Sequence, residues 1–446
     1  MSWVEKLAPL KWVPAPETDS ELVYRLASET DLPVNVVKIL VNRNIDTAAA
    51  IRQFLDPKLS DLKDPFELSD MDKGIERVTK ALFDNEKIVI YGDYDVDGIT
   101  ATALLYMIFN KLGAQVDFYL PNRLLEGYGL SQESIDEAKS KGVSLIITVD
   151  TGITAVQEVA YARSQGLDVI VTDHHEPGES LPEAVAIINP KKPGCTYGGE
   201  LSGVGVAFKF TQALYRALNQ DERELEDHLD LVALGTAADI VPLIGENRVL
   251  TKYGIKQIAR TTKPGLKSLN FVSGLMGKDI STGQVVFILA PRINALGRLG
   301  DAGQAIRLLS TRDERAGAKI ARKLDQENKR RKEIDETTLN EALAQMEEVT
   351  DLDNDRAIVL AGEGWHQGVI GIVASRLVER YHLPTVMISI ANGEGKGSAR
   401  SIPGFHLCEA LKECEPFRRK HGGHKHAAGL SIQADNTPAF TRKIIA

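Results

Sequence analysis

Three aspartates stand at alternate positions directly after a short apolar run. Asp93, Asp95 and Asp97 follow residues 88–90, which are all β-branched and typical of a buried parallel strand. Carboxylates at i, i+2 and i+4 of an extended chain point to one side and can converge. Because converging carboxylates repel one another unless a cation lies among them, the spacing predicts a cation site. An acidic loop that caps the next helix is the alternative.

Two further predicted strands end in residues of the same kind. Residues 144–149 run into Asp150, and residues 168–172 run into Asp173, His174 and His175. Right-handed crossovers bring the carboxyl ends of parallel strands to one edge of a sheet. We therefore expect these carboxylates and imidazoles to share one crevice with the three aspartates.

A fourth contribution comes from Asp239, which lies in the largely apolar stretch 230–243. A buried carboxylate is unfavourable when unpaired, whereas one that coordinates a cation is not. Oxygen ligands with one or two imidazoles suit Mn²⁺ or Mg²⁺ better than zinc. The number of carboxylates favours two such ions bridged by one of them, an arrangement used for phosphoester hydrolysis.

The elements that must position these residues alternate between helix and strand from about residue 78. Strands are predicted at 87–91, 115–120, 144–149, 168–172 and 185–188, with helices at 131–140 and 154–164 among those between them. This succession predicts a parallel sheet covered on both faces. Before it, residues 20–56 predict two short helices, the first extending as far as Leu40.

A second, smaller α/β unit is predicted to begin with strands at 357–361 and 384–390. A long helix or helical pair from 301 to about 348 precedes it, and residues 312–332 include nine Arg and Lys against four Asp and Glu. This helix either connects two domains as a solvated element or lines a nucleic-acid path. Within the second unit, a predicted turn around Ser398 and Arg400 and a Gly-Gly-His loop at 422–424 suit a phosphate.

Composition limits where and on what the protein acts. The chain has 446 residues, 43% of them hydrophobic, and a net charge of −9, so any nucleic-acid binding must come from local basic patches or bound metal. Its three cysteines have no CxxC spacing, which argues against disulfides and thiolate zinc sites and favours a cytoplasmic location. No stretch approaches the length of a membrane span, so no membrane partner is expected.

The ordered motifs resemble those of a known family. Residues 93–98, 149–152, 173–175 and 235–239 are similar to the four motifs of the DHH phosphoesterase superfamily. Residues 290–295, 364–371, 397–401 and 422–429 narrow the resemblance to the RecJ family of single-stranded-DNA-specific 5′→3′ exonucleases. The resemblance covers nearly the whole chain from about residue 20.

The resemblance implies a set of metal ligands, with Asp150 as the bridge and Asp93 as an added sixth ligand: Asp93, Asp95, Asp97, Asp150, His174 and Asp239. His175 completes the catalytic set and is expected to face the scissile phosphate rather than a metal. The strand and its 5′ end are expected to be held by Arg123, Arg298, Ser398, Arg400, Gly422, Gly423 and His424.

The resemblance also implies the domain organisation, with the catalytic cleft between two α/β domains joined by a long helix. We expect an N-terminal helical appendage at 1–77, a DHH domain at 78–255, a helical connector at 256–350 and a DHHA1 substrate-binding domain at 351–446. RecJ proteins usually continue into an OB-fold domain, which we expect to be missing from this chain.

The expected function is hydrolysis of single-stranded DNA from the 5′ end to mononucleotides, in repair and recombination. The resemblance also suggests a helicase and a single-strand-binding protein as further partners. One alternative is another DHH phosphodiesterase that acts on short oligoribonucleotides or cyclic dinucleotides. The other is a single-strand-binding replication factor that has lost catalysis, although every motif aspartate is intact here.

Overall fold

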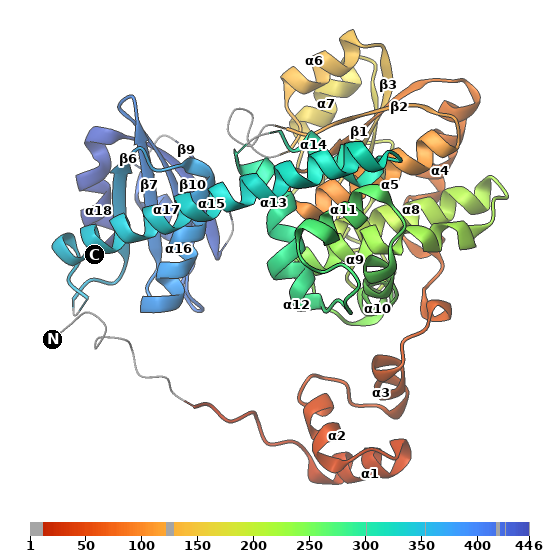
Figure 1. Cartoon of the computed structure of the whole chain (residues 1–446), viewed down its shortest axis with the longest axis horizontal. Coiled ribbons are helices and arrows are strands. Elements are labelled where there is room, and N and C mark those ends of the chain that lie inside the picture. Colours follow the sequence, from red (N-terminus) through yellow and green to blue (C-terminus); the bar gives the residue numbers. More distant parts are fainter. Residues whose placement is uncertain are drawn as a thin grey trace. The chain divides into compact units, whose positions relative to one another are not determined.

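The computed structural model describes residues 12–121, 129–299, 301–352, 354–415, 420–423 and 425–445 (Figure 1). The chain divides into two compact units. The N-terminal unit contains residues from Pro14 to Gln326, and the C-terminal unit contains those from Glu327 onward.

The N-terminal unit begins with three short helices, α1 (Ser20–Thr30), α2 (Val34–Val41) and α3 (Ala48–Leu55). The prediction of one helix extending to Leu40 is wrong. Asp31 ends α1 in the left-handed region at φ 56°. Pro33 then precedes α2, and because proline has no N–H and disfavours helical geometry in the residue before it, the two helices cannot join.

A five-stranded parallel sheet follows, as predicted. Its strands are β1 (Lys87–Gly92), β2 (Gln115–Tyr119), β3 (Val143–Val149), β4 (Asp168–Thr172) and β5 (Ala186–Ile188), in the order β2-β1-β3-β4-β5. Alternate residues of β1 enter different cores: Ile88 and Ile90 face one, and Val89 and Tyr91 face the other. Because both faces of the sheet are buried, the central strands appear as continuous apolar runs in the sequence.

Helices cover both faces of this sheet. Residues of α6 (Gln132–Ser140) and α7 (Val156–Ser164) pack in the smaller core. The larger core contains residues of α4 (Met71–Phe83), α5 (Val96–Lys111), α8 (Gly203–Ala217), α9 (Leu229–Ala238) and α10 (Gly245–Arg260).

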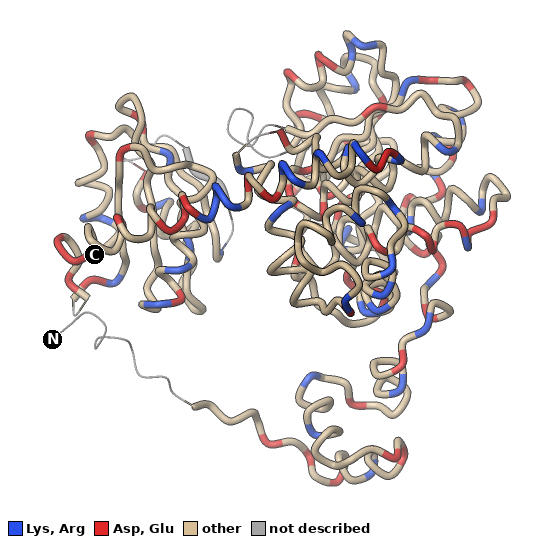
Figure 2. Tube along the Cα trace, in the orientation of Figure 1, with Lys and Arg blue, Asp and Glu red and all other residues tan. Residues whose placement is uncertain are grey.

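The same larger core continues into the helices beyond residue 260. It includes residues of α11 (Pro264–Val272), the π-helical turn η5 (Val285–Leu289), α13 (Ala290–Leu299), α14 (Gly303–Ser310) and the first part of α15 (Glu314–Val349). The short helices of this unit are η2 (Leu59–Asp61), η3 (Pro65–Glu67), η4 (Glu222–His228) and α12 (Thr282–Gln284). Along α15, Lys and Arg are mixed with Asp and Glu as far as Lys332, and every charged residue after it is acidic (Figure 2).

The C-terminal unit has its own five-stranded sheet in the order β6-β7-β8-β10-β9. The strands are β6 (Ile358–Glu363), β7 (Thr385–Ala391), β8 (Glu394–Arg400), β9 (Lys420–Gly423) and β10 (Ala427–Gln433). Only β6 and β7 pair in parallel. One core holds residues of α15 and α16 (Gln367–Tyr381), and the other holds residues of α17 (Leu407–Glu413) and α18 (Thr437–Ile445), which follows η7 (Ala434–Asn436). Within the described parts of the chain, no helix is long and apolar enough to cross a membrane.

A buried histidine predicts how the stability of the N-terminal unit depends on pH. His228 precedes α9 and is 9% exposed. Burial lowers the pKa of His228 to about 4, and Lys263 and Lys111 add to the effect. Between the ordinary value of about 6.5 and this value, the unfolded chain binds a proton that the folded chain does not, so stability falls as pH falls.

We expect the wild type to lose about 2 kcal/mol of unfolding free energy between about pH 7 and pH 5 through this group. His228→Gln should remove that part of the dependence in urea unfolding. The exposed His382→Asn is the matched control and should behave as the wild type. An identical pH dependence in His228→Gln and the wild type would contradict the assignment.

Candidate metal centre

The carboxyl ends of three adjacent strands deliver the predicted residues to one edge of the N-terminal sheet. Asp93 follows β1, Asp150 follows β3, and His174 comes two residues after β4. Because β1, β3 and β4 are neighbours, these side chains converge as right-handed parallel topology requires. Asp239 joins them from the C-cap of α9.

The ligand atoms form three overlapping groups, and within each group they lie within 4.8 Å of one another. Two members, Asp150 and His174, each belong to two groups. The groups are Asp93 with Asp95 and Asp150, Asp97 with His174 and Asp239, and Asp150 with His174 and His175.

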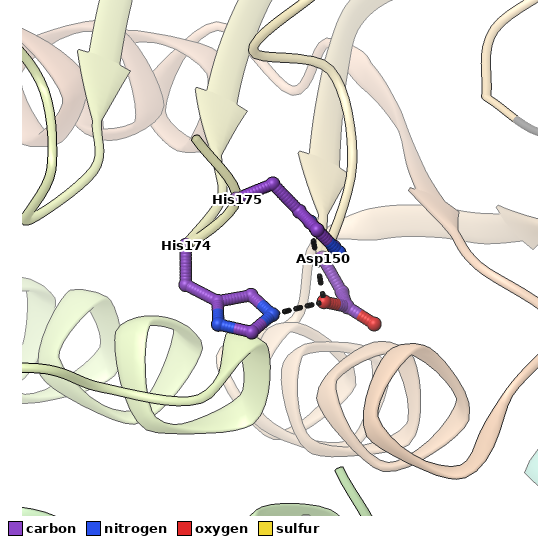
Figure 3. Close-up of side chains that lie close together, drawn as sticks. All are labelled: Asp150, His174 and His175. Carbon is purple, nitrogen blue, oxygen red and sulfur yellow. Dashed lines mark ion pairs between the residues drawn. The ribbon is translucent and has the colours of Figure 1, made fainter. Parts of the chain in front are cut away.

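His174 stands at the centre of these carboxylates. Its Nε2 lies 3.1 Å from Oδ1 of Asp150, 3.5 Å from Oδ2 of Asp239 and 3.9 Å from Oδ2 of Asp97. Figure 3 shows the rings of His174 and His175 both directed at Asp150 from the loop after β4. All six predicted ligands thus occur in these groups.

The amino end of α8 holds Asp97. The backbone N–H of Gly203 donates to Oδ2 of Asp97 (2.6 Å), and that of Val204 donates to Oδ1 (2.9 Å). A helix N-terminus favours negative charge through its unpaired N–H groups and dipole. A side chain at Gly203 is excluded, since a Cβ there would come within 2.6 Å of Oδ1 of Asp150.

The turn after β3 fixes Asp150. Its φ is 60°, a left-handed conformation that non-glycine residues adopt rarely and that is often found at functional sites. The backbone N–H of Asp150 still donates to the carbonyl of Thr172 (3.0 Å). The hydroxyl of Thr148 donates to the carbonyl of Thr151 (2.7 Å) and closes the turn.

The electrostatics of the cluster favour a cation. Burial raises the pKa of Asp97 well above its usual range, and Asp239 and Asp95 raise it further. Burial and the surrounding aspartates do the same to the pKa of Asp150. A divalent cation would compensate this concentration of negative charge.

His174 is suited to be a neutral ligand. Burial lowers the pKa of His174 to about 4, so its imidazole is uncharged at neutral pH. Its Nε2 is buried and makes no hydrogen bond, although it faces three carboxylates. A set of carboxylate oxygens with one imidazole nitrogen fits Mn²⁺ or Mg²⁺.

Asp173, which the sequence placed in the crevice without a ligand or catalytic role, organises the loop after β4. Its Oδ1 accepts from Nδ1 of His175 (2.7 Å) and from the N–H of His174 (2.7 Å), and its Oδ2 accepts from the N–H of Ile153 (2.9 Å). Burial raises the pKa of Asp173, but the hydrogen bond and charge of His175, together with the backbone N–H groups of Ile153 and His175, outweigh it, so the pKa is lowered. Its place beside the two histidines was the signal that could have identified it.

The same hydrogen bond sets the charge of His175. Burial lowers the pKa of His175, but Asp173 more than reverses this and raises it to about 9. The side chain is 40% exposed. His175 is therefore a protonated group at the open side of the cluster.

The predicted substrate-binding residues lie in different places. Arg298 is on α13, next to Gly297, where a Cβ would come within 2.6 Å of the carbonyl oxygen of Tyr94. Helix α13 therefore lies against the loop that carries the three aspartates. Arg123 and His424 fall outside the described residues.

The turn predicted around Arg400 is wrong, because Arg400 is the last residue of strand β8. Its Nη1 donates to Oγ of Ser398 (3.1 Å) and to the carbonyl of Ala399 (2.8 Å). A Cβ at Gly371 would come within 2.8 Å of Oγ of Ser398, so Ser398 and Arg400 face the first turns of α16.

The predicted Gly-Gly-His loop is also wrong in its described part. Gly422 and Gly423 lie in β9 and pair with Gly429 and Ala428 of β10. This pairing makes them part of the edge of the second sheet.

Comparisons with known proteins agree with this architecture. Residues 87–236 match the model of the DHH family, N-terminal domain, and residues 354–446 match that of the DHHA1 domain. The single-stranded-DNA-specific exonuclease RecJ of Escherichia coli is 39% identical over 446 residues, covering 95% of this chain and 77% of that protein. The chain belongs to the RecJ family.

The RecJ of Bacillus subtilis is 45% identical over 429 residues, which cover 96% of this chain and 54% of that protein. The chain therefore spans about half the length of this relative. A crystal structure of RecJ from Thermus thermophilus in complex with Mn²⁺ matches with a TM-score of 0.83 and 32% identity over 96% of this chain and 60% of that chain. A manganese-bound exonuclease RecJ matches with a TM-score of 0.76 and 36% identity over 85% of this chain and 94% of that chain.

Proposed function

We propose that this chain is a metal-dependent exonuclease that hydrolyses single-stranded DNA from the 5′ end to mononucleotides. The observation that carries the proposal is the set of overlapping ligand groups sharing Asp150 and His174 in a chain of the RecJ family. The relatives named above are single-stranded-DNA-specific exonucleases. We further propose action in the cytoplasm, in DNA repair and recombination, with a helicase and a single-strand-binding protein as partners.

Two divalent ions, Mn²⁺ or Mg²⁺, fit the cluster. Asp93 and Asp95 would hold one ion, Asp97, His174 and Asp239 would hold the other, and Asp150 would bridge them. When bound, such a pair lowers the pKa of a water molecule and offsets charge on the phosphate that is attacked. Solved RecJ structures are described in complex with Mn²⁺ and with Mg²⁺.

The protein's own side chains supply the remaining steps. His174, kept neutral by burial, offers the lone pair of Nε2. His175 is oriented through Nδ1 by Asp173, and its protonated ring would donate from Nε2 to an oxygen of the scissile phosphate. Such a charge-assisted hydrogen bond stabilises negative charge that develops during hydrolysis.

For the end of the strand, we propose that Arg400 with Ser398 holds the 5′ phosphate and that Arg298 contacts the strand near the aspartates. Arg123, Gly422, Gly423 and His424 remain further candidates for contacts with the DNA. A guanidinium pairs with two phosphate oxygens at once. Ser398 and Arg400 already lie within hydrogen-bonding distance of each other, so both can act on one phosphate.

The metal assignment is tested with Asp239→Asn. The side chain of Asp239 is 22% exposed, so the substitution should leave the fold intact while removing a charged ligand. We expect at least a hundredfold loss of hydrolysis of labelled single-stranded DNA in Mn²⁺, roughly the upper range for loss of a metal-site interaction. EDTA should abolish wild-type hydrolysis.

Asp136→Asn is the matched control, because this carboxylate bonds to the hydroxyl of Tyr161 at an exposed position. It should retain wild-type activity. Activity of Asp239→Asn close to the wild type, or wild-type hydrolysis that persists after chelation, would contradict the assignment.

End selection is tested with Arg400→Ala and Arg400→Lys. The wild type should prefer 5′-phosphorylated over 5′-hydroxyl single strands, and Arg400→Ala should reduce that ratio of kcat/KM about ten- to a hundredfold. Arg400→Lys should restore it only in part, since an ammonium cannot pair bidentately. The control Lys443→Ala removes an exposed cation that pairs with Glu413 and should leave the ratio unchanged. An unchanged ratio in Arg400→Ala would show that another residue selects the end.

A further inference from the structure

Two buried hydroxyl groups meet beside the metal centre and have no part in the chemistry described so far. Oγ of Ser202 lies 2.7 Å from Oγ1 of Thr236, and either can be the donor. Both residues are completely buried. Ser202 is the N-cap of α8, and Thr236 lies in the last turn of α9.

The two helices joined by this hydrogen bond each carry part of the ligand group formed by Asp97, His174 and Asp239. The first two residues of α8, directly after Ser202, donate their N–H groups to both carboxylate oxygens of Asp97. Helix α9 ends three residues after Thr236 at Asp239, whose N–H still donates to the carbonyl of Gly235 (2.9 Å). The Ser202–Thr236 bond thus connects the backbone that orients one ligand to the helix that carries another.

Apolar packing alone would not fix the separation of α8 and α9 so closely. Dispersion contacts are individually weak and non-directional, whereas a buried hydrogen bond confines its two atoms to a narrow distance. Ser202 is itself fixed, because its Oγ also accepts from the N–H of Gly205 (3.1 Å). Next to Thr236 on α9, a Cβ at Gly235 would come within 2.7 Å of Oδ1 of Asp97. Helix α9 therefore lies as close to Asp97 as its backbone allows.

We propose that Ser202 and Thr236 are positioning residues that set the separation of Asp97 and Asp239 and thereby complete one of the two cation sites. This proposal rests on the metal site of the proposed function. In this proposal the hydroxyls act only through the helices that they join.

Thr236→Val and Thr236→Ser separate the hydroxyl from the shape of the side chain. Valine keeps the volume and removes the hydroxyl, and serine keeps the hydroxyl and removes a methyl group. The full chain, freed of metal with EDTA, is titrated with Mn²⁺ by calorimetry. The wild type should bind two ions, and Thr236→Val should weaken one of them about ten- to a hundredfold, as expected when a group that orients a ligand is lost. Thr236→Ser should stay within about threefold of the wild type.

A double-mutant cycle tests whether Ser202 and Thr236 act through the same hydrogen bond. Ser202→Ala loses both the helix cap and the link to Thr236, so it should weaken the same ion, and adding Thr236→Val to it should weaken binding little further. Melting temperatures of the metal-free variants are measured in parallel.

Two results would overturn the proposal: unchanged Mn²⁺ affinity in Thr236→Val, or affinity that follows the metal-free melting temperature across the four variants. A wild type that binds fewer than two Mn²⁺ ions would overturn the metal site itself and this proposal with it. The wild-type titration therefore distinguishes the two failures.

Discussion

Repulsion among buried carboxylates is the constraint around which the N-terminal unit is built. Asp97 and Asp150 are each at most 2% exposed, and Asp239 lies in the same ligand group as Asp97. Two unit charges about 5 Å apart repel by about 3 kcal/mol at an effective dielectric constant of about 20. Because whole domains are stable by only about 5–15 kcal/mol, several such pairs could not all be ionised without compensation. The raised pKa values of Asp97 and Asp150 express this conflict, and a divalent cation resolves it.

Strand ends and a helix terminus hold these charged side chains in place. Parallel strands bring Asp93, Asp150 and His174 to one edge, and the amino end of α8 supplies two N–H groups to Asp97. Gly203 and Gly235 allow two helices to approach the carboxylates so closely that a methyl group would not fit. Asp173 accepts hydrogen bonds from both histidine residues and keeps His175 protonated, whereas burial keeps His174 neutral. Neighbouring groups of the same type thereby acquire different chemical roles.

The sequence predicted the first sheet well, because β1, β3 and β4 are mostly β-branched apolar runs buried on both faces. It failed at β10, although Ala428, Leu430 and Ile432 are buried there at alternate positions. It also failed at β8, whose buried positions are Gly395, Gly397 and Ala399, and a Cβ at either glycine would overlap neighbouring side chains. A strand that buries glycine carries no hydrophobic alternation to detect. The charged members of the site were predictable from their spacing and the family motifs. The contacts that support these residues were not predictable. Ser202 and Thr236, for example, are 34 positions apart in the sequence, and serine and threonine are common in any sequence.

We propose that these residues hold two cations bridged by Asp150. Crystals grown with Mn²⁺ and measured at the manganese absorption edge test it most directly, because anomalous difference maps locate each ion independently of the protein coordinates. We expect two peaks roughly 3.5–4 Å apart, both coordinated by Asp150, with His174 on the peak that Asp97 and Asp239 share. A single peak, or peaks that Asp150 does not contact, would contradict it.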